Sequence, residues 1–419
     1  MDTMTRRRFL IRSGVVGGTA LVAAGAGYTI WDILATAGDP TRGPGDKTLV
    51  LVTLYGGNDG LATVIPYADA AYHDARPELS YKDTEVLRLD DATGLNPSLK
   101  GIQSLYDAGQ LAVVRGVGYP KPDRSHFRSM DIWQTADPVR PSTTGWLGRW
   151  LDTVGGDPRL AVSLEPILPP VLAGERSAGA AVSVNGLKLP KGIPDRAITA
   201  LAARQPGEPP LQARAAACYA DMLDIDRLIT DVREQSTDDS DDLGDNDDTA
   251  ATGTGGAQSP LQAQLDLVAQ CVEVGVSTRV FSVSLGGFDF HADEKPAQER
   301  ILRELDTAVA GFLNRMAKSD RGRDVVVMIY SEFGRRVRAN ASDGTDHGTA
   351  SNVFLAGPGI NGGQLIGDQP SLTDLDDGDL KFGIDFRDVY ASVLSDVLGA
   401  DPGPILSDWS GRLPTLLRP

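Results

Sequence analysis

The sequence predicts an α/β fold in which a mostly parallel sheet has helices on both faces. Short, continuously apolar runs suit strands that are buried on both sides, and here they alternate with helix-length stretches. Such alternation builds a mostly parallel sheet, because each helix crosses back over the sheet before the next strand begins. In the clearest helix, 294–318, apolar residues recur every three or four positions along one face. The clearest strands are 48–55, 111–117, 279–285, 324–330 and 352–355.

The first residues are typical of a twin-arginine (Tat) export signal. Three arginines at 6–8 precede Phe9 and Leu10, a weakly hydrophobic run follows over 14–31, and Ala-Thr-Ala at 35–37 forms a small-x-small cleavage signature. A membrane anchor is the alternative, because the run approaches the roughly 20 apolar residues that a bilayer requires. Since its glycines make it a poor span, we expect residues 1–37 to be removed and the protein to be exported to the periplasm, the cell surface or the medium.

Residues 46–419 are predicted to form one domain with two interruptions. The stretch 154–210 is rich in Pro, Gly and Ala and has weak periodicity, which suits an insertion or a small cap. The acidic tract at 235–260 resembles a calcium loop in composition, but it lacks the spacing and the final glutamate of an EF-hand, so we expect a disordered loop. Cys218 and Cys271 lie on either side of this tract, and the sequence allows both a disulfide between them and two free thiols.

Composition and motifs exclude several classes of function. There are 57 acidic and 40 basic residues, and the resulting formal charge of −17 argues against a nucleic-acid partner, which requires a basic face. Neither a P-loop nor a dinucleotide-binding glycine motif follows a predicted strand. The G-x-S-x-G elbow of serine esterases is missing as well. We expect contact with a membrane only through the export signal.

Polar side chains gather where four of the predicted strands end. In open α/β sheets the ligand crevice lies outside the carboxyl ends of the strands, so these side chains should meet at one edge. Carboxylates and imidazoles together form a mixed oxygen and nitrogen ligand set that suits a divalent ion. We therefore predict one or two bound divalent metal ions, with zinc and manganese favoured. The polar residues that gather at these strand ends are Asp59, Ser125, His126, Asp289, His291, Glu332, Arg335, Asp346 and His347.

Each of these residues also has a structural interpretation. Asp59 lies in the turn-forming run Gly-Gly-Asn-Asp-Gly, and Ser125 is placed to cap a helix. Glu332 and Arg335 suit a surface ion pair, and the histidines suit ordinary structural roles. The functional interpretation depends on the set as a whole, because three of the four histidines lie at these strand ends. The fourth, His73, is predicted to be structural.

Several sequence blocks resemble a known family. They are Tyr-Gly-Gly-Asn-Asp-Gly-Leu at 55–61, the segment 117–133, Gly-Phe-Asp-Phe-His at 287–291, Ser-Glu-Phe-Gly-Arg at 331–335, Gly-Thr-Asp-His-Gly at 344–348 and the helix start at 385–391. Together they resemble the family named domain of unknown function 1501. Its members are exported bacterial proteins similar to the alkaline phosphatase and sulfatase superfamily. The resemblance implies an alkaline-phosphatase-like domain with two metal ions at the carboxyl edge of the sheet.

The same resemblance implies a role for individual residues. Asp59 matches a ligand of one metal, and Ser125 matches a nucleophile at a helix N-terminus. Asp289 and His291 match the pair that serves the other metal. In the superfamily, an adjacent Asp-His pair supplies one ligand to each of the two metals.

That adjacent pair is matched by Asp346 and His347. The chain departs from the superfamily in two respects: Asp289 and His291 are unusually close in sequence, and no histidine follows His347. Either His126 or Glu332 then completes the second site, or only one metal binds.

The expected function is that of an exported, metal-dependent hydrolase of phosphate or sulfate esters. Ser125 would attack the ester, and Arg128 and Arg335 would stabilise charge on the group being transferred. The substrate would be a small molecule or an ester borne on a polymer. The alternative is a non-catalytic exported protein of the same fold that binds a cell-surface polymer or partner. This alternative is motivated by the missing histidine and by the stretch 154–210.

Overall fold

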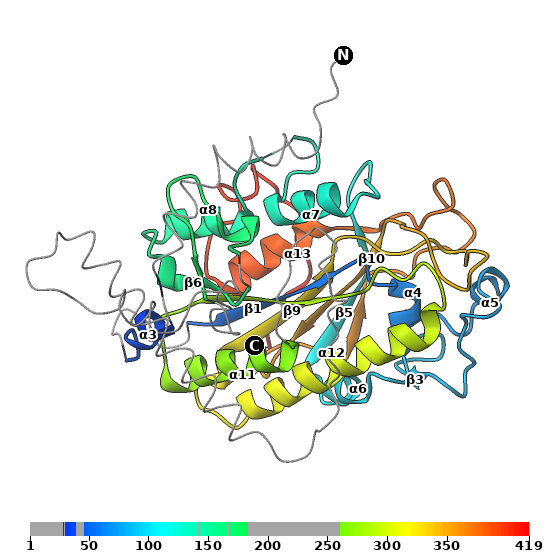
Figure 1. Cartoon of the computed structure of the whole chain (residues 1–419), viewed down its shortest axis with the longest axis horizontal. Coiled ribbons are helices and arrows are strands. Elements are labelled where there is room, and N and C mark those ends of the chain that lie inside the picture. The colour runs from blue at the N-terminus through cyan, green and yellow to red at the C-terminus, as the bar shows by residue number, and fades with distance from the viewer. Residues whose placement is uncertain are drawn as a thin grey trace, which may run out of the picture.

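The main sheet forms the centre of the molecule. The computed structural model describes residues 28, 30–38, 46–140, 142–165, 167–182 and 260–418. Within these residues the sheet has nine strands in the order β11-β5-β10-β9-β1-β8-β6-β7, and β12 pairs with β5 (Figure 1). The strands are β1 (Thr48–Tyr55), β5 (Leu111–Gly118), β6 (Ala161–Ser163), β7 (Ala180–Ala181), β8 (Val280–Gly286), β9 (Val325–Ser331), β10 (Ser351–Ala356), β11 (Gln364–Ile366) and β12 (Ile384–Asp385).

Neighbouring strands are parallel except at β10. This strand is antiparallel to both β5 and β9, whereas the remaining pairs in the main sheet are parallel. The carboxyl ends of β1, β5, β8 and β9 therefore share one edge. The predicted fold class, a mostly parallel sheet with helices, is confirmed.

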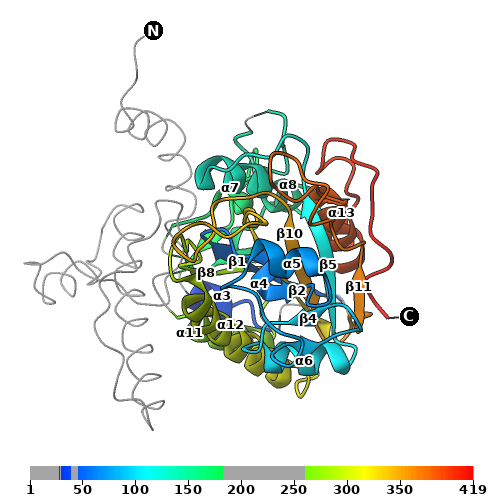
Figure 2. The ribbon, with the colours of Figure 1, turned by 90° about the vertical axis from the view of Figure 1, so that its right-hand side faces the viewer.

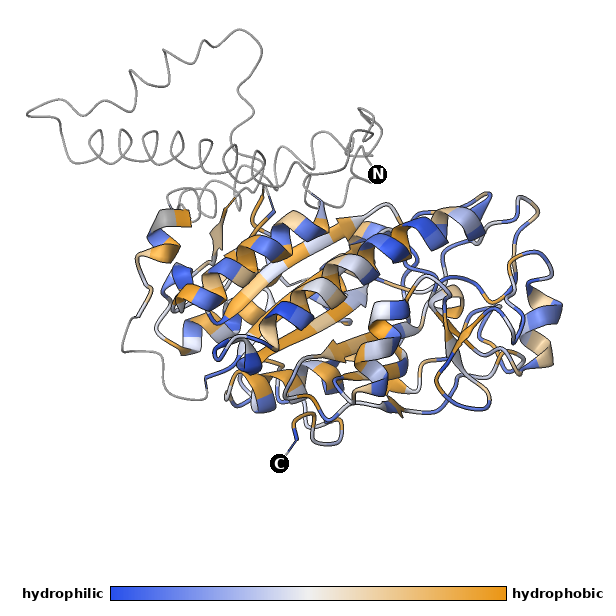
Figure 3. Ribbon diagram, turned by 90° about the horizontal axis from the view of Figure 1, so that it is seen from below, coloured by the Kyte–Doolittle hydropathy of each residue, from blue (hydrophilic) through white to orange (hydrophobic). Residues whose placement is uncertain are grey.

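Helices cover both faces of the sheet, as Figure 2 shows. Side chains alternate along β1, so Val50 and Val52 pack in the core beneath α6, α11 and α12, whereas Leu49 and Leu51 pack in the core beneath α7, α8 and α13. Figure 3 shows hydrophobic residues along the strands and mixed character on the helices in front of them. The helices are α3 (Ile30–Leu34), α4 (Gly60–Thr63), α5 (Ala70–Ala75), α6 (Lys100–Asp107), α7 (His126–Thr135), α8 (Trp146–Thr153), α11 (Leu261–Val274), α12 (Glu294–Met316) and α13 (Phe386–Ser392).

Shorter elements connect these layers. A small antiparallel sheet is formed by β2 (Val64–Ile65), β4 (Gly94–Leu95) and β3 (Leu87–Arg88). Single 3-10 turns lie at Pro158–Leu160, Pro170–Leu172 and Gly322–Asp324, and α13 continues into a π-helical turn at Val393–Val397.

The described part of the predicted insertion, 154–182, contributes to the main sheet. Here β6 pairs with β8, and β7 pairs with β6. Strands of three and two residues are too short to give a periodic pattern, which is why the sequence did not reveal them. Residues 183–259, with the acidic tract and Cys218, lie outside the described residues. Cys271 is buried on α11 and has no disulfide partner among the described residues.

The end of the predicted export signal packs against the domain. Ile30 and Ile33 are buried in the same core as α11, and the Thr36 hydroxyl accepts a hydrogen bond of 2.9 Å from the backbone N–H of Ser277. Gly38 donates its N–H to the carbonyl of Gly275 over 3.1 Å. Residues 30–38 are thus part of the folded domain, at the amino end of β8. None of the helices in the described part of the chain has the length and hydrophobicity to cross a membrane.

The packing of α3 predicts a loss of stability when it is trimmed. Replacing Ile33, whose exposed fraction is 0%, by Ala should lower the free energy of unfolding by about 2–5 kcal/mol. Ile167, at 74% exposed, is the matched control, and Ile167→Ala should change stability by less than about 0.5 kcal/mol. Urea denaturation of a chain that retains residues 28–38 measures both changes. Equal effects in the two variants would show that α3 does not support the domain.

Candidate metal centre

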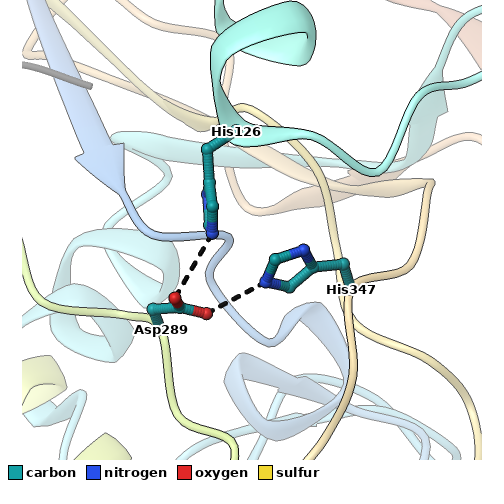
Figure 4. A group of neighbouring side chains, drawn as sticks. All are labelled: His126, Asp289 and His347. Carbon is teal, nitrogen blue, oxygen red and sulfur yellow. Dashed lines mark hydrogen bonds and ion pairs between the residues drawn. The ribbon is translucent and has the colours of Figure 1, made fainter. Parts of the chain in front are cut away.

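The loops at the carboxyl edge of the sheet bring three distant side chains together. His126 is the first residue of α7, after the loop that follows β5, and Asp289 lies in the loop after β8. His347 lies between β9 and β10, and an isolated antiparallel bridge to Arg335 fixes its loop. One ligand atom from each side chain lies within 4.8 Å of the other two. We call these three residues the central cluster (Figure 4).

Two contacts define the geometry of the central cluster. His347 Nε2 is 3.1 Å from Asp289 Oδ1, and His126 Nε2 is 3.4 Å from Asp289 Oδ2. Asp289 thus faces one imidazole with each of its oxygens, as Figure 4 shows. Two nitrogen donors and a carboxylate form a ligand set that suits zinc.

The outer nitrogen of each imidazole has a partner of its own. His126 Nδ1 is 2.8 Å from Oε1 of the buried Glu332, and His347 Nδ1 donates over 2.8 Å to the backbone carbonyl of Arg124. His126 Nε2 is buried, and apart from its contact with Asp289 it has no hydrogen-bond partner among the described residues. Metal-bound histidines usually donate the second ring N–H to a carboxylate or a carbonyl, as here. The residues present therefore fit a divalent metal ion.

His291 stands on the open side of the central cluster. Its Nε2 lies 3.1 Å from His347 Nε2 and 3.1 Å from Asp289 Oδ1, while its Nδ1 is 3.5 Å from Asp346 Oδ1. Atoms bound tetrahedrally to zinc at 2.0–2.1 Å lie roughly 3.3 Å apart, so the distances from His291 to His347 and Asp289 suit a further ligand. The group whose ligand atoms all lie within 4.8 Å of one another is nevertheless His126, Asp289 and His347. The structure places Asp346 behind His291 and not within the central cluster.

The pKa values of Asp289 and His126 are shifted in opposite directions. Burial favours the neutral form of Asp289, but hydrogen bonds from His126, His347 and Arg335 outweigh it and hold the pKa of Asp289 far below its usual range. Burial disfavours charge on His126 too, yet its contacts with Asp289 and Glu332 raise its pKa to about 9. Asp289 is therefore ionised at neutral pH, and a metal ion must displace a proton from His126.

Glu332 and Arg335 support the site from beneath. Glu332 is fully buried and accepts hydrogen bonds from the backbone N–H of Gly56 at 2.9 Å and the hydroxyl of Ser331 at 3.0 Å, in addition to its contact with His126. Arg335 is also buried and donates to Asp289 Oδ1 at 2.7 Å. Its other donors bind the carbonyls of Gly56, Gly57, Phe288 and Thr345. The structure gives both residues a positioning role.

Loss of the carboxylate behind His126 should weaken metal binding. Glu332→Gln is expected to lower affinity for zinc by about 10–100-fold, because the imidazole is then oriented and polarised less strongly. Glu165, another buried glutamate, is hydrogen-bonded to Tyr55 and Ser282, so Glu165→Gln serves as the control and should bind zinc as the wild type does. Chelator competition measures both affinities. Equal affinities in the two variants would contradict the role given to Glu332.

Asp59 lies in a separate, buried network. Its Oδ1 accepts from the backbone N–H of Leu61 at 3.0 Å and caps α4, while its Oδ2 forms a buried ion pair with Arg76. Glu294 is hydrogen-bonded to Asp59. Burial and the neighbouring Asp59 carboxylate raise the pKa of Glu294 to about 9. The structure does not bring Asp59 to the central cluster. No sequence pattern pointed to Arg76 or Glu294, because neither stands near a predicted strand end.

Ser125 and Arg128 occupy the start of α7. Ser125 is exposed at the N-cap, where its hydroxyl makes no capping hydrogen bond. Of its two neighbours in sequence, His126 belongs to the central cluster, and the Arg124 carbonyl accepts the hydrogen bond from His347. Arg128 forms an ion pair with Asp131 on the same helix, and the structure does not bring it to the central cluster.

Comparisons with solved structures give distant similarities. One is a protein in the alkaline phosphatase superfamily from Vibrio parahaemolyticus, with 11% identity, a TM-score of 0.40 and coverage of 91% of this chain and 77% of the other. The lipoteichoic acid synthase LtaP from Listeria monocytogenes has 10% identity, a TM-score of 0.39 and coverage of 90% and 80%. Alkaline phosphatase from the Antarctic bacterium TAB5 has 11% identity, a TM-score of 0.34 and coverage of 75% and 92%.

Sequence comparisons identify the family. A search of curated protein sequences finds no match to this chain. Residues 117–413 match the family described as protein of unknown function (DUF1501). The matched region begins at the end of β5, contains His126, Asp289 and His347, and spans well over half of the sequence. The chain therefore belongs to the DUF1501 family.

Proposed function

We propose that the chain is an exported, metal-dependent hydrolase of phosphate or sulfate esters. The observation that carries the proposal is the convergence of His126, Asp289 and His347, with the outer nitrogen of each imidazole held by a partner. Imidazole and carboxylate donors suit zinc or manganese. The twin-arginine signature at the start of the sequence supports export.

Ser125 is the proposed nucleophile. It is exposed at the amino end of α7, where the helix dipole favours negative charge, and it is adjacent in sequence to His126. A divalent ion, when bound, lowers the pKa of a nearby hydroxyl and stabilises charge on the ester oxygens. The Ser125 oxygen bonds to phosphorus or sulfur as the bond to the alcohol breaks, and the alcohol leaves with a proton. Water then cleaves the Ser125 ester and releases the inorganic acid.

The test compares metal content with hydrolysis of a panel of phosphate and sulfate esters. Ser125→Ala should keep its metal, measured by mass spectrometry, and should lose at least about a hundredfold in kcat. Ser104, exposed on α6, is the matched control, and Ser104→Ala should remain fully active. Full activity of Ser125→Ala on every ester that the wild type hydrolyses would eliminate this mechanism. Failure of the wild type to bind zinc or manganese would favour a binding protein of the same fold.

A further inference from the structure

The predicted cleavage signature, Ala-Thr-Ala, lies in a folded turn that follows α3 directly. The N–H groups of Thr36 and Ala37 donate to carbonyls three residues earlier in the chain, over 3.0 and 2.9 Å. Gly38, on the far side of the bond that processing would cut, has a φ of 76°. Hydrogen bonds between residues three apart and a positive φ both belong to a turned backbone, so the signature is not extended.

A peptidase requires the signature in an extended form. Proteins that bind an extended peptide pair with its main chain and take alternate side chains into pockets. A small-x-small signature presents its first and third residues in this way, here Ala35 and Ala37. Both are exposed, but Thr36 between them is 4% exposed. Its hydroxyl donates to the carbonyl of Ile33 over 2.6 Å and accepts from the N–H of Ser277 over 2.9 Å. The signature is therefore exposed in part but held in a conformation that does not fit a peptidase.

The domain fixes this turn from both sides. Before the turn, α3 packs beside α11 (Figure 1), with Ile30 2% and Ile33 0% exposed in the core that both helices share. After the turn, the N–H of Gly38 donates to the carbonyl of Gly275 over 3.1 Å. Extension of the signature must break the turn and withdraw Thr36 from its pocket of hydrogen bonds. Proteolysis of a folded protein proceeds through such a locally open state, and its rate follows the population of that state.

We propose that the folded chain resists cleavage after Ala37 and that the exported protein keeps the residues before this bond. The twin-arginine route carries proteins that have already folded, so a peptidase meets the signature only after α3 has docked on α11. The setting of this inference rests on the export in the proposed function. The resistance itself requires neither a metal ion nor Ser125.

The first experiment compares the folded chain with a synthetic peptide of residues 14–45. A purified bacterial signal peptidase should cut the peptide after Ala37 and should cut the full chain at least about a hundredfold more slowly, because the open state of the chain is rare. Intact masses of the denatured products measure both rates. The N–H groups of Thr36, Ala37 and Gly38 should also exchange with deuterium at least about a hundredfold more slowly in the chain than in the peptide. Hydrogen exchange makes this comparison independent of any peptidase.

Two variants should open the turn without changing the alanines of the signature. Thr36→Val removes the hydroxyl that binds both Ile33 and Ser277, and cleavage of the full chain should become several-fold faster. Ile33→Asp places a charge in the core, and cleavage should become at least about tenfold faster. Ile167, at 74% exposed, provides the matched control, and Ile167→Asp should resist as the wild type does. Peptides that carry either change at residue 33 or 36 should be cut at the wild-type peptide's rate.

Four outcomes would overturn the inference. The full chain could be cut after Ala37 as fast as the peptide, or its three amides could exchange as fast as those of the peptide. The peptidase could leave the peptide uncut, in which case the fold protects no cleavage site. Finally, the chain recovered from the periplasm of an expressing bacterium could begin at Gly38.

These outcomes are distinguishable from failure of the proposed function. None of them depends on metal content or on ester hydrolysis, so an inactive chain can still resist cleavage. A chain that never leaves the cytoplasm would contradict export and this inference together, whereas an exported chain that begins at Gly38 would contradict the inference alone.

Discussion

Asp289→Asn is expected to abolish metal binding while leaving the domain folded. Asp289 supplies the carboxylate of the central cluster, and each of its oxygens faces a histidine nitrogen. Removal of its charge should cost more than the 10–100-fold in metal affinity that follows loss of an outer partner. Metal content by mass spectrometry and the metal-dependent rise in melting temperature measure the effect.

The control for this variant lies in the same loop. Asp293 is exposed and forms the N-cap of α12 in a left-handed conformation with φ of 46°, which asparagine also tolerates. Asp293→Asn should therefore keep its metal and its stability. A full complement of metal in Asp289→Asn would mean that the central cluster is not the ligand set.

Arg76→Met is expected to give the largest loss of stability among the substitutions considered. The Arg76 and Asp59 side chains are each 1% exposed, and removal of one partner from a buried ion pair leaves an uncompensated charge. The cost is about 3–5 kcal/mol of unfolding free energy. Arg76 also donates to the carbonyl of Val337 at 2.9 Å, so its loss frees the loop that leads toward His347.

An exposed ion pair between the same two residue types, arginine and aspartate, provides the control. Arg88 and Asp83 are 2.8 Å apart with side chains 58% and 54% exposed, and Arg88→Met should cost less than about 1 kcal/mol. A companion variant, Asp59→Asn, should be destabilised but should keep its metal. If Asp59→Asn folds normally and binds no metal, then Asp59 is a ligand, and the assignment of this residue to a structural network is wrong.

The sequence was informative wherever the position of a residue depends on the sheet. Buried strands can be recognised from continuous apolar runs, and parallel strands deliver the residues that follow them to one edge. This reasoning placed His126, Asp289 and His347 at the same edge although they are far apart in the chain, and the structure has them within ligand distance of one another.

The remaining details depend on pairings that no local pattern encodes. Asp59 follows a strand as Asp289 does, yet Arg76, the C-cap residue of α5, holds its carboxylate instead. Glu332 and Arg335 follow β9 at the same edge of the sheet, but both are buried and bonded to the backbone, Glu332 to the N–H of Gly56 and Arg335 to the carbonyl of Gly57, which makes them supports. The short strands β6 and β7 are recognisable only by their partners in the sheet. In each case a contact between distant segments decides the role.

The docking of residues 30–38 has a consequence for orientation. Gly38 and Thr36 bind residues 275 and 277, just before β8, whereas the central cluster lies beyond the carboxyl end of the same strand. The N-terminal segment and the central cluster are therefore at opposite ends of the sheet. A contact made with residues 30–38 would therefore leave the central cluster uncovered at the far end of the sheet.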